Sequence, residues 1–192
     1  MIPTSLWFAG CSKTGPSDEK LTSVNASPSL SASGAQNTPS SVQAVPDTHY
    51  QLGTKVSFGD AGDSERFRGS GWSQTETDKT WTEGNSAILS FTALPAGESF
   101  QLQMTLLGLT NPPGLVAQPT EVYANGQKVA DWQVSDRGEY TATIPANVVS
   151  NDGTLKIELR IPKATSPKLI GQSADPRLLG LGCFDLVIEK AP

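Results

Sequence analysis

Carboxylates are the side chains of this sequence best suited to acid–base chemistry, and several occupy one short stretch. They are Asp60, Asp63, Glu65, Glu76, Asp78 and Glu83. Two carboxyl groups roughly 5–9 Å apart can hydrolyse a glycosidic bond, with one of them acting as general acid. No spacing in this stretch fixes such a pair, so a two-carboxylate glycoside hydrolase is the third hypothesis below.

The same acidic stretch offers oxygen ligands for a hard cation. Asp60 and Asp63 are candidates for a structural calcium site, because calcium prefers carboxylate and carbonyl oxygens. The segment does not have the spacing of an EF-hand loop. Apart from this calcium alternative, we expect no metal and no cofactor.

Other common chemistries lack the residues they need. His49 is the only histidine, so Ser–His–Asp catalysis has a single base available, and that base precedes the patterned region. Cys11 and Cys183 lie far apart in the sequence and do not form a zinc motif with one histidine. The net charge of -5, without clustered Lys and Arg, argues against nucleic-acid binding. No run approaches the ~18 apolar residues that cross a bilayer.

Tryptophans are the residues best suited to recognition. Sugar rings present flat C–H faces that stack on aromatic rings, and neighbouring polar groups then bond the hydroxyls. The candidates for such a site are Trp72, Trp81 and Trp132, with Glu76 and Glu83 as polar neighbours. Folding back of the chain between residues 72 and 81 would bring the first two rings together. The alternative is that these rings fill or cap a core.

The elements that must position these residues are strands. From residue 50 onward the hydrophobic pattern has period two, most clearly over residues 98–108 and 154–161, which predicts strands with one buried face. Asn125-Gly126 lies between two such runs and predicts a tight hairpin. About eight strands and no convincing helix indicate an all-β fold, an antiparallel β-sandwich of jelly-roll type over residues 50–190. A barrel is the competing architecture.

Polar and small residues near the C-terminus suggest structural roles. Arg177 is expected to pair with a carboxylate such as Asp175 or Asp185. Gly180 and Gly182, inside a predicted strand, indicate a bulge or a close backbone approach. Cys183 is expected to be a small buried hydrophobe rather than a reactive thiol.

The first residues have the character of a targeting segment. Apolar residues lead to Ala9-Gly10-Cys11, which resembles the lipobox of bacterial lipoproteins and predicts lipidation of Cys11 after removal of a signal peptide. A chance Gly-Cys near an ordinary N-terminus is the alternative. Residues 12–49 are rich in Ser and Pro and predict a disordered linker. Ser12 after the cysteine favours the outer membrane, so we expect a lipid-anchored envelope protein facing the periplasm.

Two blocks of motifs resemble a known domain. The first block comprises Gly71-Trp72-Ser73, Glu76, Trp81-Thr82-Glu83-Gly84 and Ala87-Ile88-Leu89-Ser90-Phe91. The second comprises Ser166-Pro167, Leu169, Gly171, Ser173, Asp175, Arg177 and Leu179-Gly180-Leu181-Gly182. Together they resemble an uncharacterised β-sandwich domain found C-terminal to some bacterial membrane glycosyltransferases and related envelope-glycan enzymes. The resemblance spans about residues 56–188. It implies an accessory or binding role near envelope polysaccharide and supplies no catalytic residues.

Three hypotheses follow. The first is a non-enzymatic envelope lipoprotein whose sandwich binds carbohydrate or supports envelope polysaccharide assembly. The second is a structural or protein-interaction module that docks on a glycan-assembly enzyme through a sheet edge or an apolar patch. The third is the two-carboxylate hydrolase.

Overall fold

The computed structural model describes residues 47–192. The predicted signal segment, Cys11 and residues 12–46 of the predicted linker lie outside the described residues. Residues 47–49 precede the expected start of the domain but already contact it. His49 forms an isolated parallel bridge with Thr92, and the amide of Thr92 donates to the carbonyl of Thr48 at 2.9 Å.

The described residues form ten strands and one short 3-10 helix. The strands are β1 (Val56–Ser57), β2 (Trp72–Thr75), β3 (Thr80–Glu83), β4 (Ser86–Phe91), β5 (Phe100–Gly108), β6 (Gln118–Ala124), β7 (Gln127–Val134), β8 (Gly138–Ile144), β9 (Leu155–Arg160) and β10 (Leu179–Lys190). The helix η1 (Ser64–Phe67) lies between β1 and β2. Among residues 47–192, no helix has the length and apolarity needed to cross a membrane.

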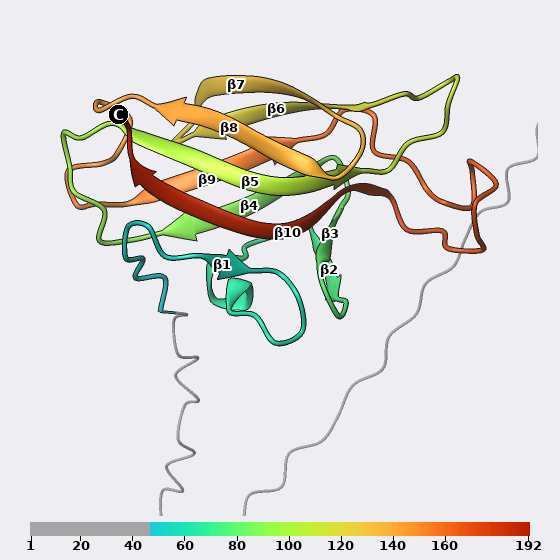
Figure 1. The fold of residues 1–192 in the computed structure, drawn as a ribbon, viewed down its shortest axis with the longest axis horizontal. Helices are drawn as coiled ribbons and strands as arrows, with labels where there is room; N and C mark the ends of the chain where they lie inside the picture. Colours follow the sequence, from blue (N-terminus) through green and yellow to red (C-terminus); the bar gives the residue numbers. More distant parts are fainter. Residues whose placement is uncertain (1–46) are drawn as a thin grey trace, which may run out of the picture. The chain divides into compact units, whose positions relative to one another are not determined.

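The strands build two antiparallel sheets that face each other. One sheet has six strands, in the order β2-β3-β10-β5-β8, with β1 also paired to β10. The other has four, in the order β4-β9-β6-β7. Figure 1 shows β10, β5 and β8 in front and β4, β9 and β6 behind. The prediction of an all-β antiparallel sandwich is therefore confirmed.

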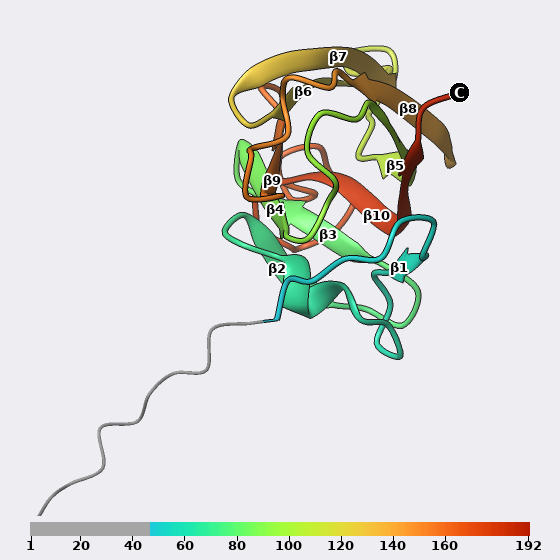
Figure 2. The ribbon, with the colours of Figure 1, turned by 90° about the vertical axis from the view of Figure 1, so that its left-hand side faces the viewer.

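The core lies between the sheets because alternate residues of each strand point inward. Strand β5 alternates buried and half-buried residues along its whole length, and Phe100, Leu102, Met104 and Leu106 are fully buried. Strand β9 buries Leu155, Ile157 and Leu159 in the same way. Viewed along the strands, Figure 2 shows the two sheets enclosing this space.

Two backbone features set the geometry of the fold. Asn125 and Gly126 both have positive φ, 45° and 84°, as the predicted hairpin between β6 and β7 requires. Strand β10 is the longest strand and pairs with β3, β5 and β1. Its register shifts between Leu179 and Gly182 against β3, and between Cys183 and Asp185 against β5. These irregularities determine which side chains of β10 reach the outer face of the sheet.

Candidate functional site

The β2–β3 hairpin positions the first two candidate tryptophans. Trp72 pairs with Thr82, and the amide of Glu76 donates to the carbonyl of Lys79 across the turn at 2.8 Å. Paired residues of neighbouring strands point to the same face, whereas successive residues of one strand point to opposite faces. Trp72 therefore shares the inner face with buried Thr82, and Trp81 points outward. The chain does fold back between the two residues, but their rings do not form one platform.

Trp72 is part of the inner packing. Its ring lies 5.2 Å from that of Phe58, and its indole N–H donates to the carbonyl of Ile88 at 2.8 Å. The exposed edge of the ring borders a shallow hollow of about 220 Å³ that is also lined by Glu65, Arg68 and Ser73. A ring held on one face and at its nitrogen offers only this edge to a ligand.

Trp132 is a core residue, so its assignment as a carbohydrate platform is wrong. Its side chain is 6% exposed, and its indole N–H donates to the carbonyl of Thr141 at 2.9 Å. Its ring packs against that of Tyr140, with the centroids 5.9 Å apart. Strand β7 crosses to β8 at this position, where the two sheets meet, and the large ring fills the space between them.

Trp81 lies on the outer face of the six-stranded sheet. It pairs with Gly182 of β10, which faces outward because its neighbours Leu181 and Cys183 are buried in the core. Two ring carbons of Trp81, Cζ2 and Cη2, lie 3.5 Å from the position that a Cβ on Gly182 would occupy. The indole therefore lies against the backbone of β10, and its side chain is half-buried.

Charged residues lie near Trp81 along the β2–β3 hairpin. The aliphatic stem of Lys79 also passes over Gly182, and its ammonium bonds Glu76 at 2.7 Å and Asp78 at 3.2 Å. These hydrogen bonds raise the pKa of Lys79, the bond to Glu76 contributing most. Glu83 is exposed on β3, two residues beyond Trp81. The hairpin that carries Trp81 therefore also carries hydrogen-bond donors and acceptors.

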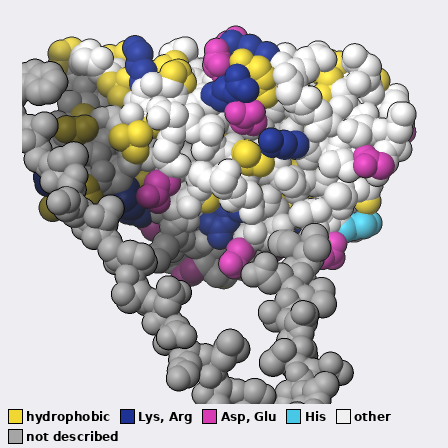
Figure 3. Space-filling model, turned by 180° about the vertical axis from the view of Figure 1, so that it is seen from behind, with side chains coloured by type: hydrophobic (Ala, Val, Ile, Leu, Met, Phe, Trp, Pro, Cys, Tyr) yellow, Lys and Arg dark blue, Asp and Glu magenta, His cyan; other side chains and the backbone are white. Residues whose placement is uncertain are grey.

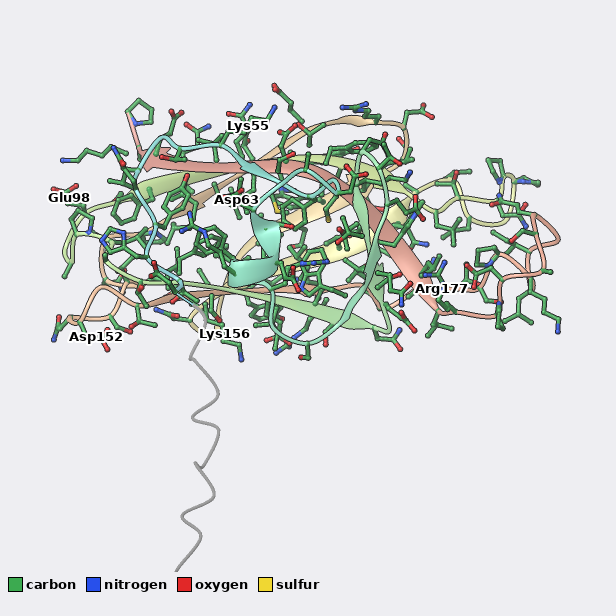
Figure 4. All side chains as sticks on the ribbon, turned by 90° about the horizontal axis from the view of Figure 1, so that it is seen from below. Lys55, Asp63, Glu98, Asp152, Lys156 and Arg177 are labelled. Atoms are coloured by element: carbon green, nitrogen blue, oxygen red, sulfur yellow. The ribbon has the colours of Figure 1, made fainter. Side chains whose placement is uncertain are left out.

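Asp175 and Arg177 form a clamp beside the hairpin. The guanidinium of Arg177 bonds both carboxylate oxygens of Asp175, with Nη2 2.6 Å from Oδ2, and this contact lowers the pKa of Asp175. Its Nη1 also donates to the hydroxyl of Ser73 on β2. Figure 4 shows Arg177 beside the start of β10, at the opposite end of the domain from Asp152. The clamp ties the loop before β10 to β2, whereas Asp185 pairs with Lys55 at 3.0 Å.

Of the two residues considered for calcium, Asp63 is engaged within the loop itself. The Oδ1 of Asp63 accepts from the amide of Ser57, and its Oδ2 lies 3.3 Å from Arg66. Asp60 is exposed. Across residues 47–192, no group of three or more His, Cys, Asp or Glu side chains is placed to hold a metal ion.

Phe184 and Arg137 were not identified as site residues by sequence reasoning. The register shift before Asp185 leaves Phe184 outside the main core cluster, yet only 6% exposed. The guanidinium carbon of Arg137, which precedes β8, lies 3.8 Å from the centre of the Phe184 ring. For Phe184, the sequence offered one indication, Gly182, because a glycine in a strand marks a bulge or a close backbone approach. Nothing in the sequence pointed to Arg137.

The outer face of the four-stranded sheet carries a second hollow. Its volume is about 350 Å³, and its lining includes Glu121, Glu158 and Arg160. Figure 3 shows acidic and basic side chains intermixed on this side of the domain. Arg160 binds Glu158 at 2.8 Å and covers the ring of Tyr123 at 4.0 Å, while Lys128 binds Glu121 at 2.9 Å. These charged groups pair with one another, and Arg160 covers one face of the Tyr123 ring, so that face is not available to a ligand.

Comparisons with known proteins give structural likenesses only. No protein-family profile and no curated protein sequence matches the chain. The CBM36-1 domain of a multidomain xylanase from the hindgut metagenome of Trinervitermes trinervoides is similar at 17% identity and a TM-score of 0.43, covering 72% of this chain and 98% of that one. A CBM36 carbohydrate-binding module in complex with calcium and xylotriose is similar at 13% identity and a TM-score of 0.42, covering 71% and 99%.

A third solved structure is the C-terminal CBM6 of the laminarinase LamC from Zobellia galactanivorans. It is similar at 10% identity and a TM-score of 0.40, covering 71% of this chain and 98% of that one. Likenesses at these identities and TM-scores do not transfer function between proteins. The role of this chain therefore rests on its own residues.

Proposed function

We propose that this domain binds carbohydrate, without catalysing its cleavage, on the outer face of the six-stranded sheet around Trp81. We name this surface the Trp81 face, and it comprises Trp81, Lys79, Gly182 and Leu107. The observation that carries the proposal is the indole of Trp81 lying on Gly182, with ring carbons 3.5 Å from the missing Cβ. Because Gly182 has no side chain, the ring can lie close to the backbone of β10.

The chemistry of this face suits a sugar. Leu107, on β5, pairs with Gly182 of β10 and is half-buried. It therefore extends the apolar surface beside the ring. Glu76, Lys79 and Glu83 supply acceptors and donors at the border. An apolar platform with few polar groups around it matches a sugar ring, which has C–H faces and hydroxyl edges.

A binding role is favoured over glycoside hydrolysis because the best acidic candidate is already engaged. Glu76 holds the ammonium of Lys79 at 2.7 Å. Glycoside hydrolysis requires two carboxyl groups that face the scissile bond and are free to exchange protons. Glu83 is exposed on β3 and has no ion-pair partner among residues 47–192. A carboxylate pair of this kind supports contacts to hydroxyls better than catalysis.

We further propose that this function is exerted at a bacterial cell envelope, with Cys11 as the lipid anchor and the outer membrane as its location. The support is the lipobox-like sequence that ends at Cys11 and the resemblance of the two motif blocks to the accessory domain of envelope-glycan enzymes. The ligand would then be an envelope polysaccharide, or a glycan in transit to it. A glycan-assembly protein is the alternative partner.

The first test is a glycan-array measurement with the wild type and the Trp81→Ala variant. We expect the variant to lose at least tenfold in affinity, about 1.4 kcal/mol, because stacking on the ring is removed. Tyr123→Ala on the opposite sheet is the matched control and should bind as the wild type does. Equal binding by the wild type and Trp81→Ala, with Tyr123→Ala weakened instead, would move the site to the other sheet.

A second variant tests the position of the Trp81 ring while keeping the ring itself. Gly182→Val keeps Trp81, but its side chain meets the ring and the stem of Lys79, whose Cδ lies 3.2 Å from the added Cβ. Because the clash is with the far ends of side chains, the fold should survive while the ring is lifted from the sheet. Reduced affinity with an unchanged circular dichroism spectrum is the expected result. Unchanged affinity would show that the flat ring is not the platform.

A further inference from the structure

Arg137 stands apart from every other arginine of the described chain. Arg66, Arg160 and Arg177 each bind a carboxylate, and Arg68 donates to the hydroxyl of Thr80. Within residues 47–192, Arg137 makes no ion pair and no side-chain hydrogen bond, although Asp136 and Glu139 are its near neighbours in sequence. Its five N–H donors are therefore available to a ligand.

The guanidinium of Arg137 is nevertheless held in place. It stacks on the ring of Phe184 at 3.8 Å, and that ring is itself only 6% exposed. Stacking fixes the plane of the group while leaving its N–H edge and its outer face open. A positioned guanidinium with free donors is the group best matched to a two-oxygen anion, because its fork binds both oxygens at once.

Arg137 and Trp81 lie on the same face of the sheet. Trp81 pairs with Gly182, Gly182 pairs with Leu107, and Leu106 pairs with Gly138, the residue after Arg137. Strands β3 and β8 are three places apart, which separates their backbones by about 14 Å. Gly182 and Phe184, the two residues beneath the ring and the guanidinium, are two positions apart on β10, about 7 Å. An oligosaccharide lying across β10 and β5 would meet both groups.

We propose that Arg137 is the specificity-determining residue of the Trp81 face and selects a glycan that carries an oxyanion, the carboxylate of a uronic acid. This inference rests on the proposed function, since Trp81 holds the sugar chain and Arg137 reads its charge. Asp185, the acid nearest to Phe184 on β10, is engaged by groups other than Arg137. Asp185 is held by Lys55 at 3.0 Å and by the hydroxyl of Thr105 at 2.8 Å. Glu139, exposed on β8, makes no ion pair with Arg137 within residues 47–192.

The test compares uronate-bearing polysaccharides with their carboxyl-reduced counterparts, which keep the sugar chain and lose the charge. The wild type should bind at least one acidic glycan about tenfold more tightly than its reduced form. Arg137→Gln should abolish this preference while leaving the affinity for the reduced form unchanged. Arg137→Lys, which keeps the charge without the fork, should recover only part of the preference. Lys128→Gln, on the opposite sheet, is the matched charge control and should have no effect.

Sulfated glycans and their desulfated forms make a second arm, because a sulfate ester presents the same oxygen geometry. Preference for the sulfated form alone, lost in Arg137→Gln, would replace the uronate with a sulfate and overturn the named ligand. Equal binding of acidic and reduced glycans that still depends on Trp81 would overturn the role of Arg137 and leave the proposed function standing. Absence of binding to every glycan, in the wild type as well, would overturn both.

Discussion

Replacing Gly71 with alanine is expected to lower the free energy of unfolding by about 3–5 kcal/mol. Gly71 has a φ of 86°, and an added Cβ would collide with the carbonyl oxygen of Ser86 and lie 2.8 Å from the Cα of Ala87. Both obstacles are backbone atoms of β4, so no side-chain rotation relieves the clash. The carbonyl of Gly71 also accepts from the amide of Glu83 at 2.8 Å. The substitution therefore separates the β2–β3 hairpin from its neighbours.

Gly84→Ala is the matched control for this prediction. Gly84 has a φ of 90°, but nothing lies within 4 Å of the position of its added Cβ. The free energy of unfolding of that variant should fall by only about 1–2 kcal/mol, the cost of placing an alanine in a left-handed backbone conformation. Urea unfolding of the two variants measures both free energies, and their difference gives the cost of the clash with β4 apart from the cost of the positive φ. Equal losses would show that the close approach of Gly71 to β4 does not contribute to stability.

Cys183 is expected to react with a thiol reagent at least about a thousandfold more slowly in the folded protein than in urea. Its side chain is 0% exposed in the middle of β10, between Thr80 of β3 and Leu106 of β5. Burial raises the pKa of the thiol, so the thiolate that attacks the reagent is scarce as well as inaccessible. Reaction must await opening of the sheet.

The labelling of Cys183 is measured by mass spectrometry of the peptide that contains it, which keeps Cys11 out of the comparison. Because Cys183 lies directly beside Gly182, its protection also reports whether the floor of the Trp81 face is rigid. Rapid labelling in native conditions, at a rate near that in urea, would contradict the structure at this strand.

The strands that the sequence predicted are those whose inward residues are apolar. Residues 98–108 and 154–161 alternate cleanly because one face meets a core and the other meets water. The hairpin at β2 and β3 was missed because its inward residues on β3 are threonines. Thr80 donates to the carbonyl of Phe58 at 2.7 Å, and Thr82 accepts from the amide of Leu181 at 2.9 Å. Buried hydroxyls bonded to the backbone leave no hydrophobic alternation to detect, so ten strands are found where about eight were expected.

The candidate site was predictable only in part, because exposure depends on which face of a strand a residue occupies. Trp72, Trp81 and Trp132 are equivalent by composition, but the structure buries Trp132 and turns Trp72 toward Phe58. For Trp72 and Trp81, the strand pairing within the hairpin decides which ring faces inward, and a register shift of one residue would exchange the two faces. Arg137 was beyond prediction because its position depends on a register shift in β10, far away in the sequence.

The most direct test of the central claim follows the indole N–H resonances of the tryptophans by ¹H–¹⁵N NMR while the tightest-binding glycan of the array is added. The indoles of Trp72 and Trp132 donate to backbone carbonyls at 2.8 and 2.9 Å, whereas that of Trp81 makes no hydrogen bond within residues 47–192. The Trp81 resonance, assigned with a Trp81→Phe variant, should shift saturably with glycan while those of Trp72 and Trp132 stay in place. A stationary Trp81 resonance, with that of Trp72 moving instead, would contradict the account and place the ligand in the hollow beside Arg68.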